Sequence, residues 1–231
     1  MNKKADRCSM ERGKFIKLLA AAAAVSETAL LAAAGFGTKA QTKSDKLIHR
    51  NEQPSMTYRK LGRTNFMSSR LVFGCAAVSF GGKKVRLLDR AFEAGINHYD
   101  SGYEIAYKGS ERSLAPFLKT HREKVWVASR ARLSVRVKPE NSITLEQAKT
   151  AAKNWTKQLN SSLENLQTEY VDAYYLMDVR NPTFIRSEEI YMAFLDAKAA
   201  GKVGHFGLTA YANTQKVLEA AIETGWYDFW R

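Results

Sequence analysis

Short apolar runs and longer stretches with a helical period follow one another along residues 58–230. The apolar runs are rich in β-branched and aromatic side chains and predict strands at 96–100, 125–129, 170–177, 203–208 and 226–230. Between them, apolar residues three and four apart predict helices at 84–95, 110–120, 144–166, 187–200 and 213–223. Ahead of these elements, residues 58–74 predict a hairpin, with GRTN as its turn, that runs into one further strand.

Residues suited to helix ends support these boundaries. Gly95 and Gly201 follow the last periodic residue of their helices, where a left-handed glycine often ends a helix. Thr144 and Gln147 have the spacing of a capping box. Ser110 is expected to be the N-cap of the helix that follows it.

Strands that are each separated by a helix predict parallel pairing with right-handed crossovers. Both an open doubly wound sheet and a (β/α)₈ barrel fit this order. No G-x-G-x-x-G follows the first strand, which weakens a dinucleotide-binding open sheet. A barrel places its chemistry at the carboxyl ends of the strands. Four residues would then share one rim: Asp100, Arg130, Met177 and Thr209.

Charge and cysteine content exclude several classes of function. The formal net charge is +13, but residues 1–50 hold ten Lys or Arg against four Asp or Glu. The rest is mildly basic, with no basic stripe interleaved with aromatic residues, so no nucleic-acid partner is predicted. Two cysteines, Cys8 and Cys75, offer neither a disulfide framework nor metal-ligand spacing, and no metal site is predicted. Cys75 is expected to be a small buried residue.

The first forty residues have the order of an export signal: a basic start, an apolar stretch, then small residues. RGKFIK, residues 12–17, resembles the twin-arginine signal with Gly13 in place of the second arginine. Glu27 interrupts the apolar stretch, so no stable membrane span is expected. A disordered or loosely helical arm is the alternative. We expect residues 1–40 to be export-signal-like, residues 41–56 to be a polar linker, and the protein to be exported or periplasmic, or cytoplasmic if the signal is inactive.

Several segments together resemble the aldo-keto reductase family. They are YRKLGRTNFMSSRLVFG, AFEAGINHYDSGYEIAYKGSERSLAPFL, VWVASR, YVDAYYLM and GKVGHFGLTAY, in the order and at the spacing of the family. The resemblance implies a (β/α)₈ TIM-type barrel that transfers hydride from NADPH or NADH to an aldehyde or ketone without a metal. About six strand–helix units fall within residues 57–231, so the barrel is expected to be incomplete. A fragment, or closure by association with another chain, would explain this, and the oligomeric state stays open.

The resemblance implies roles for residues of the rim. Asp100 matches the family aspartate, and Arg130 stands where a lysine lowers the pKa of the catalytic tyrosine. Ile105 occupies the position five residues after Asp100, where that tyrosine is expected. Tyr107 is the candidate proton donor, because YKGSE resembles Y-G-x-S-E, and Tyr103 is the second candidate.

The same resemblance bears on cofactor and substrate contacts. Met177 stands where a histidine orients the substrate oxygen, and a thioether has no proton to donate. Thr209 matches a serine that contacts the nicotinamide, and the resemblance also places Asp100 at the cofactor. Ala210 replaces a neighbouring asparagine.

Structural roles are the alternative for each of these residues. Asp100 and Arg130 could be a buried ion pair that joins two strands, and the two tyrosines could be half-buried loop aromatics. Thr209 could be an ordinary residue at a strand end. The chain as a whole could then be a non-catalytic binding or regulatory module of the same descent, or a non-functional gene fragment.

Overall fold

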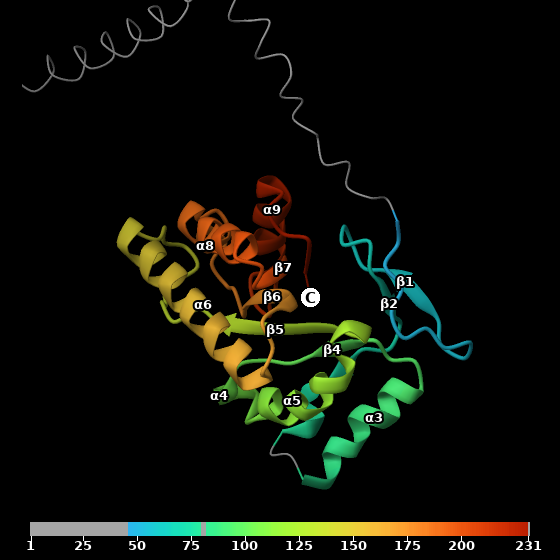
Figure 1. The fold of residues 1–231 in the computed structure, drawn as a ribbon. Helices are drawn as coiled ribbons and strands as arrows, with labels where there is room; N and C mark the ends of the chain where they lie inside the picture. Colours follow the sequence, from blue (N-terminus) through green and yellow to red (C-terminus); the bar gives the residue numbers. More distant parts are fainter. Residues whose placement is uncertain (1–45, 80–81, 231) are drawn as a thin grey trace, which may run out of the picture. The chain divides into compact units, whose positions relative to one another are not determined.

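The structure, a computed structural model, describes residues 46–79 and 82–230 (Figure 1). The export-signal-like segment expected at residues 1–40 lies outside the described residues. In residues 46–79 and 82–230 no helix is long and apolar enough to cross a bilayer.

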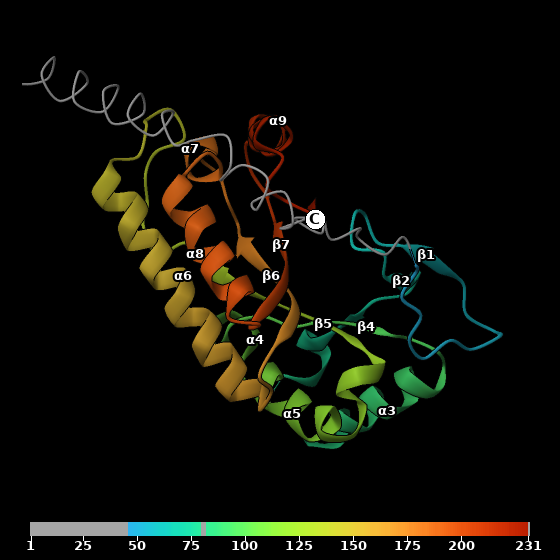
Figure 2. The same cartoon turned by 45° about the horizontal axis from the view of Figure 1, so that its top comes forward.

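The described residues form one six-stranded parallel sheet whose strand order follows the chain. Its strands are β3 (Phe73–Gly74), β4 (His98–Asp100), β5 (Trp126–Arg132), β6 (Val171–Met177), β7 (Val203–Leu208) and β8 (Phe229–Trp230). The sheet curls as half of a barrel, with helices on its outer side (Figures 1 and 2). The fold class predicted from the sequence, an α/β fold matching an incomplete (β/α)₈ barrel, is confirmed.

The long helices occur where the hydrophobic period predicts them. They are α3 (Arg86–Glu93), α5 (Ser110–His121), α6 (Leu145–Leu166), α8 (Glu188–Ala199) and α9 (Thr214–Thr224). Short helices not predicted from the sequence lie in the loops: η2 (Cys75–Val78), η3 (Gly82–Val85), α4 (Glu104–Tyr107), η4 (Arg122–Lys124) and α7 (Pro182–Ile185). One-turn helices are too short to produce a hydrophobic period, so the sequence pattern gives no sign of them.

Each strand separates two apolar layers, because successive side chains of a strand point to opposite faces. Outward-facing residues such as Tyr99, Tyr174 and Phe206 pack with the helices in the larger core. Inward-facing Trp126 and Tyr175 join a smaller core inside the half-barrel. The His98 ring lies on this inner face, 6.1 Å from the Trp126 ring between centroids. Asp100 is two residues after His98 and Arg130 is four after Trp126, so both candidate site residues share the inner face.

The hairpin of β1 (Tyr58–Lys60) and β2 (Met67–Ser69) is antiparallel, as predicted. Phe66, directly before β2, is fully buried and stacks on Trp126 with ring centroids 4.8 Å apart. The hairpin therefore supplies an aromatic side chain to the inner core.

Residues 46–56, expected to be a linker, include two side chains that contact the body of the fold. The Arg50 guanidinium donates to the Val125 carbonyl at 2.7 Å and to the Asp172 carboxylate at 2.9 Å. Asn51 Nδ2 donates to the Phe92 carbonyl at 2.7 Å. These contacts attach the segment to the amino-terminal ends of β5 and β6 and to the end of α3.

Helix ends confirm most of the capping predictions and correct one. Gly95 and Gly201 follow the ends of α3 and α8 with φ of 85° and 72°, as predicted. Thr144 and Gln147 form the predicted capping box, with bonds of 3.2 and 2.9 Å. The prediction for Ser110 is wrong, because Gly109 is the N-cap and Ser110 is the first helical residue. Gly109 has a φ of 81° and joins α4 almost directly to α5, a connection that the pattern did not predict. The Ser110 hydroxyl instead shares a hydrogen bond with that of Ser101 at 2.8 Å.

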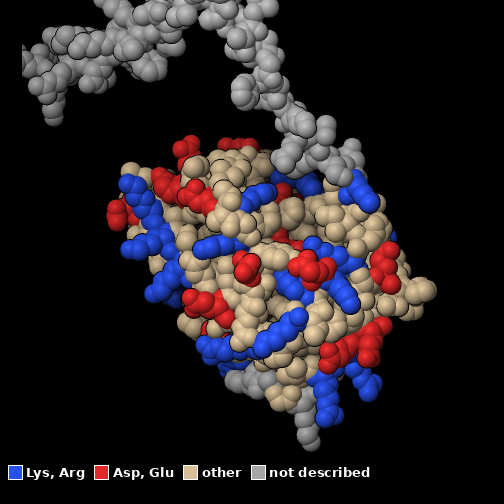
Figure 3. Space-filling model, in the orientation of Figure 1, with Lys and Arg blue, Asp and Glu red and all other residues tan. Residues whose placement is uncertain are grey.

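Charged side chains of both signs share the face seen in Figure 3. Lys and Arg follow the outer edge of α6, where Lys149, Lys153 and Lys157 are exposed, and elsewhere they alternate with Asp and Glu. On this face the positive charge is dispersed.

Candidate active site

Asp100 and Arg130 form an ion pair inside the half-barrel, where only 2% and 1% of the two residues are exposed. The Arg130 guanidinium donates to the Asp100 carboxylate, and its Nε donates to the Ser101 carbonyl at 3.0 Å. Burial alone would lower the pKa of Arg130, but the charge and hydrogen bond of Asp100 hold the pKa above its ordinary value. Arg130 therefore carries a fixed positive charge near the rim.

Two tyrosine rings flank this guanidinium. Its Cζ lies 5.2 Å from the ring centroid of Tyr107 and 5.3 Å from that of Tyr175, within the range of cation–π attraction. A Cβ at Gly102 would lie 2.5 Å from the Tyr107 ring, so this approach requires a glycine. The Ser79 hydroxyl donates to the Tyr107 carbonyl at 2.6 Å and fixes the end of α4. The structure thus brings Tyr107 to the Asp100–Arg130 pair.

Tyr103, the second candidate, contributes to a different cavity. This space of about 430 Å³ lies against α6 and also contacts the buried Glu111 and the exposed side chains of Arg132 and Arg136. Ile105 is 80% exposed. Of the tyrosines that follow Asp100 in this loop, Tyr107 is therefore the one beside Arg130.

Tyr175 was not singled out from the sequence. It sits within an apolar run, which predicts a core residue. One signal in the sequence pointed to it: Tyr175 precedes Met177 by two residues and so shares its face of the strand. That it lies opposite Arg130 needed the register of β5 and β6, which the structure supplies.

Met177 and Thr209 occupy the strand ends expected for them. Met177 is half-buried at the end of β6, opposite Arg132. Thr209 is fully buried directly after β7, and its hydroxyl accepts a bond of 2.9 Å from the Asp178 amide. Its carbonyl accepts from the Val179 amide at 2.9 Å, so Thr209 ties the ends of β6 and β7 together. A contact between Thr209 and a nicotinamide stays a prediction.

Cys75 is fully buried, which confirms the prediction of a small buried residue. It lies near both Asp100 and Arg130. Burial raises the pKa of its thiol well above the usual value, and the Asp100 charge adds to this effect. The thiol is therefore protonated at neutral pH. Across the described residues, no group of three or more His, Cys, Asp or Glu side chains could hold a metal ion.

Comparison with known proteins shows the family to which the chain belongs. Residues 71–230 match the family model described as the aldo/keto reductase family. The chain belongs to that family. An aldo-keto reductase of Bacillus halodurans, solved in its holo form, matches with a TM-score of 0.58 at 24% identity, over 73% of this chain and 54% of that one. A Pseudomonas aeruginosa protein of aldo-keto reductase type matches with a TM-score of 0.52 at 24% identity, over 66% of this chain and 59% of its own. At these identities the two structures show a shared fold.

A curated relative within the aldo-keto reductases is the norsolorinic acid reductase of Emericella nidulans. It is 28% identical over 125 residues, which are 53% of this chain and 32% of the relative. The chain thus spans about a third of that relative and about half of the Bacillus halodurans protein.

Proposed function

We propose that the chain is an NAD(P)H-dependent oxidoreductase that reduces aldehydes or ketones to alcohols. Membership of the aldo-keto reductases, whose members generally use NAD(P)H, supports this reading. When bound, the reduced nicotinamide would supply a hydride to the carbonyl carbon. Addition of a proton to the carbonyl oxygen would then complete the alcohol, and the oxidised cofactor would be the other product. NADPH is the proposed form, with NADH as the alternative.

The observation that carries the proposal is the charged Arg130 beside the Tyr107 ring, at 5.2 Å from its centroid. A fixed positive charge favours the phenolate form of a nearby tyrosine and so eases donation of its proton. The same charge stabilises an oxygen on which negative charge develops. In this account Tyr107 is the catalytic acid, Arg130 supplies the field, and Asp100 is a positioning residue that holds Arg130.

Two features predict a slow reaction. Part of the field of Arg130 is neutralised, because Asp100 pairs with its guanidinium directly. Met177 offers a thioether at the place where a substrate oxygen would gain from a hydrogen-bond donor. We therefore expect a turnover limited by the chemical step rather than by product release.

The test is reduction of 4-nitrobenzaldehyde by the full chain with NADPH, followed by both cofactor absorbance and alcohol formation. Tyr107→Phe should lower the rate about 100-fold, since loss of a general acid typically costs 10²–10⁴. Tyr103→Phe is the matched control and should stay within about twofold, because the ring beside the Arg130 guanidinium is that of Tyr107. Absence of alcohol with NADPH and with NADH would contradict the proposal.

A second candidate is a non-catalytic binding module of the same family. The closed Asp100–Arg130 pair favours it, because a guanidinium held by a carboxylate is already satisfied without substrate. Cofactor binding with no alcohol formed from any aldehyde tested would support this candidate.

A further inference from the structure

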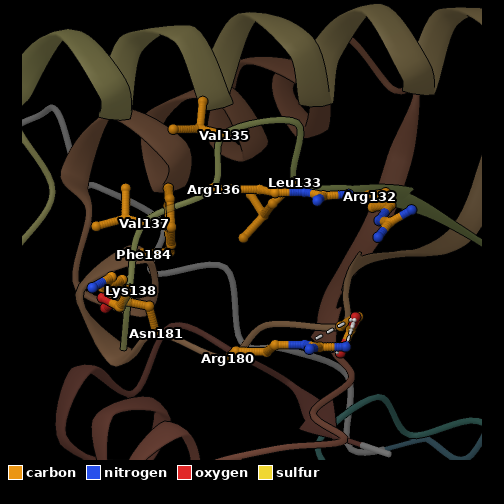
Figure 4. A pocket seen from close by; sticks show the side chains of 10 residues that line it. Arg132, Leu133, Val135, Arg136, Val137, Lys138, Arg180, Asn181 and Phe184 are labelled. Carbon is orange, nitrogen blue, oxygen red and sulfur yellow. Dashed lines mark hydrogen bonds and ion pairs between the residues drawn. The ribbon is translucent and has the colours of Figure 1, made fainter. Parts of the chain in front are cut away.

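A second concave surface lies at the same rim as the candidate site (Figure 4). We call it the rim pocket: a cavity of about 420 Å³ between residues 132–138, at and after the end of β5, and residues 178–184, after β6. It adjoins the cavity beside Tyr103, with which it shares Arg132, Leu133 and Arg136. Arg132 follows Arg130 by two residues on β5 and lies opposite Met177 in the register. Because alternate residues of a strand share a face, the rim pocket continues from the face that carries Arg130. Its volume is in the range of small-molecule sites.

The rim pocket is strongly cationic. Its charged lining consists of four cations, Arg132, Arg136, Lys138 and Arg180, and one carboxylate, Asp178. Asp178 is engaged by Arg180, whose Nη2 lies 2.8 Å from Oδ2 and whose Nε lies 3.1 Å from Oδ1. No ion pair with any carboxylate of residues 46–79 or 82–230 involves Arg132, Arg136 or Lys138. A concave surface with excess charge of one sign concentrates ligands of the opposite sign.

The remaining lining is apolar. Leu133, Val135 and Val137 are interspersed among the cations in the segment after β5 and are half-buried. Phe184, which is 3% exposed, lies on the facing wall. Figure 4 shows Arg132 and Arg136 on one side of the space and Arg180 on the other. This combination fits a molecule with an apolar body and an anionic end.

Side-chain hydrogen bonds hold the two walls in place. Asn181, which is 2% exposed, donates to the carbonyls of Lys138 and Asn141 at 2.9 and 2.8 Å and so joins the walls. Gln158 of α6 exchanges bonds of 3.1 and 2.9 Å with the backbone of Arg132. The pocket is therefore ordered before any ligand binds, which lowers the entropic cost of binding.

We propose that the rim pocket binds a carboxylate of the carbonyl substrate, through the guanidinium groups of Arg132 and Arg136. The substrate class is then an aldehyde or ketone joined by an apolar spacer to a carboxylate. A guanidinium matches a carboxylate by two parallel hydrogen bonds. The apolar wall favours such a compound over a sugar phosphate. The inference rests on the proposed function, and the test separates the two.

The experiment uses the full chain and a pair of probes of similar shape, 4-formylbenzoate and its neutral methyl ester. Binding is measured by ligand-observed NMR titration, without turnover. We expect 4-formylbenzoate to bind about tenfold more tightly than the ester, and this preference to shrink between 50 and 500 mM salt because screening weakens exposed charges. Arg136→Gln should remove most of the preference. Arg90→Gln, which deletes an exposed arginine on α3, is the control and should leave it intact.

The other outcomes overturn either the inference or the proposed function on which it rests. Equal binding of both probes, or equal effects of the two variants, would mean that Arg132 and Arg136 are ordinary solvent-exposed charges that do not bind the carboxylate. A loss of NADPH binding in Arg136→Gln, with 4-formylbenzoate unaffected, would assign the pocket to cofactor phosphates. Reduction of the ester as efficiently as of the acid would keep the proposed function and reject the substrate class. Selective binding of the acid without any reduction would keep the anion pocket and reject the reductase.

Discussion

Arg130 is bound to Asp100 across neighbouring strands, with 1% and 3% of the two side chains exposed. An isolated charge in such a place would be costly, so each partner is needed to compensate the other. The same contact holds the guanidinium between the rings of Tyr107 and Tyr175. The ion pair considered as a structural alternative is therefore present, and it also fixes the group proposed to act on Tyr107.

Asp100→Asn should lower the free energy of unfolding by about 3–5 kcal/mol, because it leaves a buried guanidinium without a counter-charge. Urea unfolding monitored by circular dichroism measures the change. The double variant Asp100→Asn with Arg130→Met should be destabilised by less than the sum of the single variants, since it removes both charges. Additive effects would show that the two side chains do not depend on one another.

Arg130→Lys should preserve turnover while reducing stability. The lysine keeps a positive charge near Tyr107 but cannot donate to both Asp100 and the Ser101 carbonyl as the planar guanidinium does. The free energy of unfolding should therefore fall by about 1–2 kcal/mol. Arg130→Met removes the charge and should lower kcat/KM about 100-fold. Equal loss of activity in the two variants would argue against a field acting on Tyr107.

Glu111 should make stability decline with rising pH. Burial raises the pKa of this carboxyl, although hydrogen bonds from Ser129 and Ser162 oppose the rise. A folded-state pKa above the unfolded one means that the native protein binds the proton more strongly. The stabilising contribution is thus complete below the unfolded value of about 4.5 and is lost as pH rises through the folded value.

The measurement is urea unfolding of the wild type and of Glu111→Gln at pH 4.5 and 7.5. Each unit of pKa difference corresponds to about 1.4 kcal/mol. The free energy of unfolding of Glu111→Gln should therefore increase relative to that of the wild type as pH rises. A difference that is the same at both pH values would show that Glu111 titrates as it does in the unfolded chain.

Cys75 should resist thiol reagents in the folded protein, because it is fully buried and its pKa is raised. The Cys8→Ser variant leaves Cys75 as the one thiol of the chain. Its reaction with 5,5′-dithiobis(2-nitrobenzoate) at pH 7.5 should be at least about 100-fold slower than in 6 M guanidinium chloride. Rapid labelling under native conditions would show that the region around β3 opens readily.

Much of the fold follows from the alternation of the two hydrophobic periods. The strands and long helices were predicted because each must bury one face, and burial imposes a period. The strand predicted to end at Ser129 continues to Arg132, since Asp100 compensates the buried charge of Arg130. Contacts distant in sequence, such as Arg50 with Asp172, leave no local pattern and were missed.

The candidate site was predictable where a rule of the fold applied to it. Strand ends place Asp100 and Arg130 at one rim. Tyr107 was proposed from the resemblance of YKGSE to the family's Y-G-x-S-E, and the structure brings it to Arg130. Tyr175 needed the register of two strands, which composition does not determine. The rim pocket needed the conformation of residues 133–138, which lie outside regular secondary structure and have no period to predict.

Hydride transfer is the central claim, and isotope transfer tests it most directly. The full chain is incubated with an aldehyde and NADPH that carries deuterium at both C4 positions, and the alcohol is analysed by mass spectrometry. If hydride is transferred from the cofactor, we expect one deuterium in each alcohol formed. With Tyr107→Phe we expect about 100-fold less product. Alcohol or deuterium no higher than with heat-denatured protein would contradict it.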